Sequence, residues 1–178
     1  MHESAFNYVS SFAENIVSEA SLVILEFGSR NVNGTVRDLF PDHAYWGIDI
    51  SDGPGVDQVA DAATFLLPEG FFADIVICCE TLEHTPLAFE IVSNAYKNLS
   101  PGGFFVVTCA TDPRKPHSAK DGGRLRRREY YGNILPQALK GSAILAGFNI
   151  EDLQIRDLPG HGGDLYMTAY KPLNTSST

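Results

Sequence analysis

Three short and almost uninterrupted apolar runs constrain the fold of this chain more than any other feature. They span Leu22–Phe27, Ala73–Cys79 and Phe104–Cys109, and they are rich in valine and isoleucine. Runs of this length and composition are typical of strands covered on both faces, as in a parallel sheet. Ala44–Ile50 is a weaker run of the same kind. We therefore expect a largely parallel sheet buried between layers of helices.

Helical patterns alternate with these runs. They occupy four segments: Glu3–Ala20, Asn33–Phe40, Thr85–Leu99 and Pro136–Ala146. Pro86 suits the first position of the third helix, and Gly147 suits the end of the fourth. This alternation predicts an α/β fold, an open sheet with right-handed crossover connections.

The last part of the chain departs from this alternation. Phe148–Arg156 and Asp164–Tyr170 have strand-like patterns, and the connection between them is too short for a crossover helix. They are therefore expected to pair antiparallel at one edge of the sheet. The length of 178 residues favours one domain, which we place at residues 1–172, with an N-terminal helix in 1–20 and a flexible tail at 173–178.

Composition disfavours several classes of protein. The formal net charge of −9 argues against broad contact with nucleic-acid phosphates. No apolar run approaches the roughly 20 residues of a membrane span, and no leader-like segment begins the chain, so a cytoplasmic location is expected. Three cysteines without C-x-x-C spacing indicate neither a disulfide framework nor a zinc site.

Small and acidic residues stand at the carboxyl ends of the predicted strands, where open α/β sheets bind ligands. Gly28 follows the first apolar run, and Asp49 stands 21 residues later. The glycine permits a sharp turn, and the acid can accept hydrogen bonds from both hydroxyls of a ribose. Arg30 stands where a dinucleotide fingerprint needs a glycine, and no P-loop ending follows. The pattern favours an adenosine that carries an amino acid, with Asp61 in reach of the adenine amino group.

Five segments in one order carry a resemblance to a known family. They are Val23–Ser29, Gly47–Asp49, Ala60–Ala62, Phe72–His84 with its Leu-Glu-His ending, and Leu99–Gly103 with its Leu-x-Pro-Gly-Gly turn. Together they resemble the motifs of the S-adenosylmethionine-dependent methyltransferases of the seven-stranded, Rossmann-like class (class I). The similar part covers about residues 22–110, and the edge hairpin continues it.

The resemblance implies a sheet of order 3-2-1-4-5-7-6, with strand 7 antiparallel and helices on both faces. It also implies S-adenosyl-L-methionine as cofactor and S-adenosyl-L-homocysteine as product. Gly28 would approach the methionine part and Asp49 the ribose, while Asp61 and Ala62 would contact the adenine. The cofactor-binding residues expected on this basis are Glu26, Gly28, Ser29, Asn33, Asp49, Ile50, Asp61, Ala62, Cys79 and Glu80.

Three further residues are candidates for the catalytic group. Glu83 and His84 follow the Ala73–Cys79 run, and His117 follows the Phe104–Cys109 run. A histidine has an unperturbed pKa of about 6.5 and can take a proton from an acceptor near neutral pH. The alternative, that each is a solvated loop residue, stays open. No convincing cluster of acids lies near Asp112, so no metal is expected.

Segment 112–135 is too long for an ordinary connection, and such loops are often lids or binding elements. It is rich in arginine and lysine although the chain is acidic. We interpret it as a lid-like insertion that recognises an anionic or aromatic small-molecule substrate. The expected contacts are Arg124, Arg126, Tyr130 and Tyr131, together with His161 of the edge hairpin. A solvated charge run beside an oligomer contact, such as a homodimer contact, is an equal alternative.

The sequence thus predicts an enzyme that transfers a methyl group to a small-molecule acceptor by in-line attack on the sulfonium methyl. Two alternatives remain open. Arg30 and Val32 stand where the family's turn usually has glycines, so the chain could bind the cofactor without turnover. The basic stretch Arg124–Arg128 could instead recruit nucleic acid or protein as the acceptor.

Overall fold

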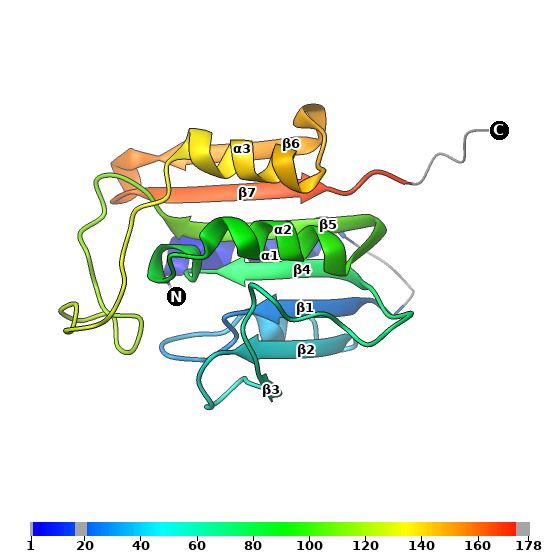
Figure 1. The fold of residues 1–178 in the computed structure, drawn as a ribbon, viewed down its shortest axis with the longest axis horizontal. Helices are drawn as coiled ribbons and strands as arrows, with labels where there is room; N and C mark the ends of the chain where they lie inside the picture. The colour runs from blue at the N-terminus through cyan, green and yellow to red at the C-terminus, as the bar shows by residue number, and fades with distance from the viewer. Residues whose placement is uncertain (1, 17–20, 174–178) are drawn as a thin grey trace.

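The computed structural model describes residues 2–16 and 21–173. Its centre is a seven-stranded sheet of order β3-β2-β1-β4-β5-β7-β6 (Figure 1). The strands are β1 (Val23–Phe27), β2 (Ala44–Asp49), β3 (Gln58–Val59), β4 (Ala73–Cys79), β5 (Leu99–Ala110), β6 (Leu153–Leu158) and β7 (Asp164–Tyr170). β7 pairs antiparallel with β5 and β6, whereas the other pairs are parallel. The predicted order and the antiparallel edge are confirmed.

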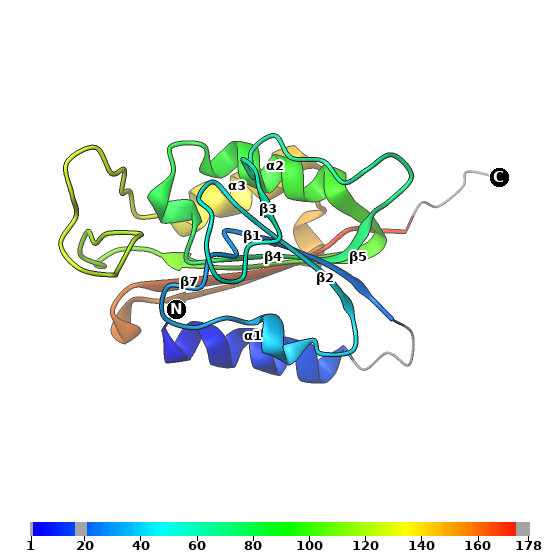
Figure 2. The ribbon, with the colours of Figure 1, turned by 90° about the horizontal axis from the view of Figure 1, so that it is seen from below.

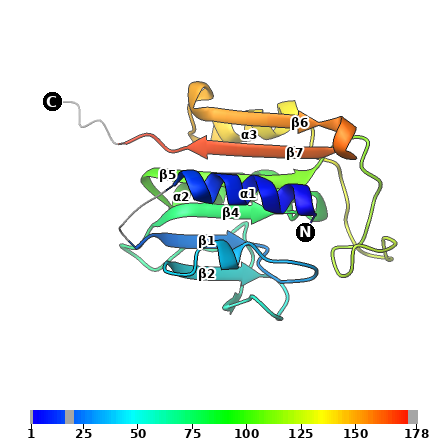
Figure 3. The ribbon, with the colours of Figure 1, turned by 180° about the vertical axis from the view of Figure 1, so that it is seen from behind.

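Helices cover both faces of the sheet, as expected. α1 (Glu3–Asn15) lies on one face, and α2 (Ala88–Asn98) and α3 (Pro136–Ala146) lie on the other (Figure 2). From behind, α1 crosses in front of β4 and β5 (Figure 3). None of the helices in the described ranges is long and apolar enough to cross a membrane.

The central strands are apolar at successive positions because they feed two separate cores. In β1, Ile24 packs into the cluster on the α1 side and Leu25 into the cluster on the α2 side, and both are fully buried. In β4, Ile77 packs into the cluster on the α1 side and Cys78 into the cluster on the α2 side. Successive side chains of a strand point to opposite faces, so a sheet between two helical layers needs apolar residues at both.

The prediction of a helix at Asn33–Phe40 is wrong. The segment contains only the three-residue 3-10 turn η1 (Arg37–Leu39). Val36 and Phe40 are buried in the core on the α1 side, and their spacing of four imitates a helical stripe. Gly34 has a φ of +139° at the start of the segment, which is not a helical conformation. Asparagine, glycine and β-branched residues there offer little intrinsic helix propensity, so a loop inserts the same apolar side chains.

Further boundaries differ from the prediction. α1 ends at Asn15 and not at Ala20, and residues 17–20 of the predicted helix lie outside the described ranges. β5 begins at Leu99 and not at Phe104. α2 begins at Ala88 and not near Thr85, whose Oγ1 accepts a hydrogen bond from the backbone N–H of Leu87 at 3.1 Å. β6 begins at Leu153 and not at Phe148, because the Phe148 side chain is buried in the core on the α2 side. The 3-10 turn η3 (Ile150–Asp152) then redirects the chain into β6.

The long connection between β5 and α3 extends beyond the carboxyl ends of the parallel strands (Figure 1). Residues 112–135 form neither helix nor strand in this part of the structure. We call this segment the 112–135 loop. The predicted tail falls largely at 174–178, outside the described residues.

Candidate functional site

A cavity of about 780 Å³ lies at the carboxyl ends of β1, β2 and β4, bordered by the 112–135 loop. Thirteen of the residues singled out from the sequence line it: Glu26, Gly28, Ser29, Asn33, Asp49, Ile50, Asp61, Ala62, Cys79, Glu80, His84, His117 and Tyr130. The cavity falls within the roughly 300–1,000 Å³ typical of small-molecule sites.

The turn after β1 requires glycine at Gly28. Its φ is +76°, and a Cβ there would come within 2.0 Å of Thr81 Oγ1. The backbone N–H groups of Gly28 and Ser29 both donate to the carbonyl of Ile48, at 2.9 and 3.0 Å, which fixes the turn to β2. Ser29 is 3% exposed, and its Oγ has no hydrogen-bond partner within the described ranges. The hydroxyl is therefore a buried, unpaired polar group beside the cavity that Ser29 lines.

Asp49 ends β2 with its carboxylate held by the backbone. Oδ1 accepts a hydrogen bond from the N–H of Ser51 at 2.8 Å, and Oδ2 accepts one from the N–H of Arg30 at 3.3 Å. Each carboxylate oxygen can accept more than one hydrogen bond. The carboxylate is thus oriented at the cavity wall with acceptor capacity on both oxygens.

Asp61 and Ala62 lie close to Asp49 because the chain after β3 bonds to the end of β2. The N–H of Ala60 donates to the carbonyl of Asp49 at 2.9 Å. Asp61 Oδ1 caps the following turn by accepting the N–H of Ala63 at 2.9 Å. The side-chain amide of Asn94 in α2 donates to the carbonyl of Ala62 at 2.9 Å and fixes its position.

Glu26 is a buried acid inside β1, 5% exposed. Burial raises the pKa of Glu26 to about 7, although the hydroxyl of Tyr45 donates to its Oε2 at 2.8 Å. The group therefore changes its charge near neutral pH, at the floor of the cavity.

β4 ends in an uncommon backbone conformation at Glu80, whose φ is +49°. Its N–H donates to the carbonyl of Thr108 at 2.8 Å, and its carboxylate lies 3.8 Å from Nε2 of His2. A left-handed residue other than glycine is uncommon and marks a place where the surroundings impose the conformation. Here it turns the chain at the cavity wall, directly after Cys79.

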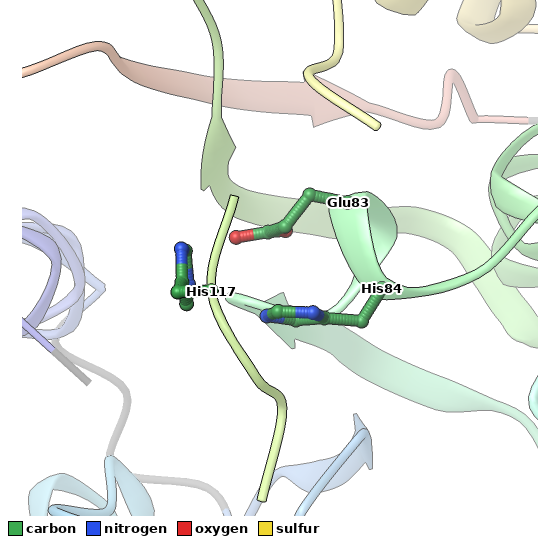
Figure 4. Close-up of side chains that lie close together, drawn as sticks. All are labelled: Glu83, His84 and His117. Carbon is green, nitrogen blue, oxygen red and sulfur yellow. The ribbon is translucent and has the colours of Figure 1, made fainter. Parts of the chain in front are cut away.

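Glu83, His84 and His117 come together beside the cavity (Figure 4). Glu83 and His84 belong to the 3-10 turn η2 (Leu82–His84), and His117 comes from the 112–135 loop. One ligand atom from each, a carboxylate oxygen or a ring nitrogen, lies within 4.8 Å of the other two. We call these residues the Glu83–His84–His117 cluster. It joins two segments that the sequence places far apart.

Glu83 is fully buried, and only part of its carboxylate is bonded. Oε1 accepts the N–H of Ala110 at 3.2 Å, whereas Oε2 has no partner among the residues described. Burial first, and the charge of Glu80 second, raise the pKa of Glu83 above its ordinary value. The carbonyl of Glu83 accepts the N–H of Gly132 at 2.8 Å, which ties the far end of the 112–135 loop to η2.

The two histidines meet edge to face, with ring centroids 5.0 Å apart. Burial first, and His117 second, lower the pKa of His84 to about 4, so its ring is neutral at pH 7. Nδ1 of His117 lies 3.1 Å from the carbonyl of Lys115 and must donate to it. Tyr131 packs on both rings, at 5.5 Å from His84 and 4.9 Å from His117.

Three other predicted substrate contacts, Arg124, Arg126 and Tyr131, do not line the cavity. Arg124 and Arg126 are exposed, and Arg126 forms an ion pair with Asp121. Tyr131 supports the cluster from outside the cavity. His161 ends the 3-10 turn η4 (Pro159–His161), and its side chain lies outside the described part of the structure.

Different basic residues of the same loop border the cavity: Arg114, Lys120 and Arg128. Arg114 forms an ion pair with the buried Asp164 and donates from Nε to the carbonyl of Gly162 at 2.8 Å, so it anchors the loop to the edge hairpin. An irregular loop has no periodicity, so the sequence does not show which of its side chains face the cavity. Its basic composition predicted that the loop would bring positive charge to the cavity, but not which residues would supply it.

No protein-family model matches the sequence, and no curated protein matches it either. Solved structures do match. An N1-methyltransferase for 1,6-didemethyltoxoflavin from Burkholderia thailandensis, with 1,6-didemethyltoxoflavin and S-adenosylhomocysteine bound, is 17% identical, with a TM-score of 0.67 over 96% of this chain and 79% of that one. A magnesium protoporphyrin IX methyltransferase from Synechocystis, with bound S-adenosylmethionine, is 17% identical, with a TM-score of 0.64 over 96% and 79%.

A third similar structure, the [4+2]-cyclase SpnF, is 16% identical, with a TM-score of 0.68 over 94% of this chain and 82% of that one. These similarities establish the fold: the chain has the seven-stranded architecture of class I methyltransferases. Because one of the three is a cyclase, the reaction has to be argued from the residues of this chain.

Proposed function

We propose that this chain, which has the class I methyltransferase fold, is an S-adenosylmethionine-dependent methyltransferase that acts on a small molecule. The observation that carries the proposal is the wall of acids where β1, β2 and β3 end. Glu26, Asp49 and Asp61 all line the cavity there. A cofactor with a sulfonium, an ammonium and a ribose suits such a wall.

The residues present fit this cofactor. Asp49 is oriented by two backbone N–H groups and keeps acceptor capacity for the two ribose hydroxyls. Asp61, twelve residues further on, can accept a hydrogen bond from the adenine amino group. Gly28 lets a ligand approach the backbone, and the buried Ser29 hydroxyl supplies a donor that is not otherwise used among the described residues.

Cofactors with phosphates fit less well. A pyrophosphate is usually bound at the N-terminus of the helix after the first strand, where backbone N–H groups and the helix dipole favour negative charge. Here the segment after β1 is a loop that ends in the 3-10 turn η1. This favours a cofactor whose adenosine carries an amino acid.

The acceptor is proposed to lie between the bound cofactor and the 112–135 loop. Lys120 and Arg128 border the cavity on that side, and neither has an ion-pair partner among the residues described. This favours a small acceptor with negative charge. The small-molecule proposal is preferred because Lys120 and Arg128 line the cavity itself, whereas Arg124 and Arg126 are exposed outside it.

S-adenosylmethionine, when bound, supplies a methyl group that is already electrophilic. The protein then has to orient the acceptor and remove water and, where needed, a proton. We assign acceptor activation to the Glu83–His84–His117 cluster, because His84 and His117 line the cavity next to Glu80. The 112–135 loop would shield the reacting groups from solvent.

Calorimetry tests the proposal. The chain should bind S-adenosylmethionine and S-adenosylhomocysteine, and bind NAD and ATP weakly or not at all. Asp49→Ala should weaken cofactor binding more than tenfold, since each hydrogen bond to a charged group is worth roughly 1.5–3 kcal/mol. Asp52→Ala is the matched control, because Asp52 lies on the same turn outside the cavity wall.

Turnover is then followed as S-adenosylhomocysteine released with a panel of anionic and phenolic metabolites. An Asp49→Ala protein that unfolds at the normal temperature and binds the cofactor as tightly as the parent would count decisively against the assignment. Tight binding without methyl transfer to any acceptor would favour the non-catalytic alternative.

A further inference from the structure

The Glu83–His84–His117 cluster has the composition of a metal site. Two histidines and one carboxylate, with open positions on one side, form a ligand set used by zinc and non-haem iron enzymes. The three ligand atoms lie within 4.8 Å of one another. Binding one ion at 2.0–2.2 Å would require the side chains to close by roughly 1 Å.

A second, independent observation is the unpartnered carboxylate oxygen. Glu83 is fully buried, and Oε2 has no hydrogen-bond partner among the described residues. No lysine or arginine of that part of the chain forms an ion pair with it. A buried carboxylate left without a partner destabilises the fold. An ionised group has an unpaired acceptor there, and a protonated group has an unpaired donor. A divalent cation removes the cost in one step.

The histidines are arranged as metal ligands usually are. The Nδ1–H of His117 donates to the carbonyl of Lys115, which leaves the lone pair on Nε2 of the neutral ring. Metal-binding histidines commonly donate their other N–H to a carbonyl in this way. Nδ1 of His84 is buried and has no hydrogen-bond partner within the described ranges. Tyr131 packs against both rings and restricts their rotation.

We propose that Glu83, His84 and His117 bind one divalent first-row transition-metal ion, such as Zn²⁺, at the acceptor side of the cavity. His84 and His117 line the cavity, so an ion can enter from it and its open coordination positions face it. Those positions would hold an oxygen atom of the acceptor and favour its deprotonated form. This role in activation rests on the proposed function, whereas metal binding itself does not.

The test is metal binding by the full chain. Protein stripped with a chelator is titrated with Zn²⁺ in a calorimeter, and its metal content is measured after gel filtration. We expect about one Zn²⁺ per chain. Glu83→Gln and His117→Asn should each weaken binding more than about tenfold. His43→Asn is the matched control, since His43 lies outside the cluster and asparagine can still accept the N–H of Leu22.

The variants remain informative if one of them misfolds. Glu83→Gln changes a buried side chain whereas His117 lies in a loop, so the two changes carry different risks of misfolding. Less than stoichiometric Zn²⁺ on the parent, or binding that both variants leave unchanged, would overturn the site and mark any bound zinc as adventitious. Zn²⁺ binding without S-adenosylmethionine binding would refute only the proposed function, and the reverse result would refute only the metal site.

Discussion

Glu26 provides the sharpest quantitative prediction, because it is a buried acid whose neutral form is favoured by folding. It is 5% exposed, and the hydroxyl of Tyr45 donates to its Oε2 at 2.8 Å. Burial outweighs this hydrogen bond and raises the pKa of Glu26 from 4.5 to about 7. The folded state therefore holds the Glu26 proton more tightly than the unfolded state.

The sign of the effect on stability follows from linkage. Between pH 4.5 and about 7 the folded chain keeps the proton that the unfolded chain has lost, so stability falls as the pH rises. The contribution is fully present below pH 4.5 and is lost above about pH 7. A pKa difference of this size corresponds to about 3 kcal/mol.

Glu26→Gln removes this dependence, because glutamine is neutral at every pH and can still accept from Tyr45. The free energy of unfolding, measured by urea denaturation from pH 4.5 to pH 8.5, should rise in the variant relative to the parent by about 3 kcal/mol across the range. Glu83, whose pKa is also raised by burial, cancels in this difference. The exposed Glu90→Gln on α2 is the control and should give a flat difference. A flat difference for Glu26→Gln would refute the reasoning.

Two further predictions concern the cavity and its cover. Gly28→Ala should lower stability by about 1–3 kcal/mol and weaken cofactor binding more than tenfold, because the new methyl group meets Thr81 at 2.0 Å; thermal unfolding and calorimetry measure both. Gly70→Ala, at a similar φ but with nothing within 4 Å, should leave the affinity unchanged, and equal losses in the two variants would contradict the steric argument. Replacing Lys115–Arg128 by a short glycine-serine linker should spare cofactor binding and abolish turnover; full turnover would disprove a lid role for the 112–135 loop.

The sheet was predictable because its signal is local. A strand covered on both faces must be apolar at successive positions, and β1, β4 and β5 meet this condition within a few residues. The two-residue β3 has no such signal, since both of its residues are exposed at the sheet edge. The order of the strands came from the family resemblance and not from periodicity.

The wrong prediction of a helix at Asn33–Phe40 arose because the burial of its apolar residues is not a local property. Burial of Val36 and Phe40 is a tertiary event, and a loop can satisfy it as well as a helix. The segment begins with asparagine, glycine and β-branched residues, which favour a helix little. A helix-like spacing of apolar residues therefore accompanies burial here without helical structure.

The functional site also contains residues that the sequence could place and residues that it could not. The turn at Gly28 and the acid at Asp49 follow strands, so their places could be inferred from the strands. The burial of Glu83 could not, because it depends on the return of the chain at Gly132, nearly fifty residues later. The side chains of the 112–135 loop are set by pairs such as Arg126 with Asp121, which no spacing rule predicts.

The two walls of the cavity differ in charge, and this gives the proposed reaction a direction. Acids such as Asp49 stand on the side of the sheet. On the side of the loop, Lys120 and Arg128 outnumber Glu129, since Asp121 is paired with Arg126. A cationic cofactor and an anionic acceptor would each be attracted to a different wall, which places them face to face. In the proposed reaction, transfer of the methyl group would cancel both charges, so both walls would lose part of their attraction for the products in the same step. The charges proposed to assemble the reactants would then also favour release of the products, without any change in the protein.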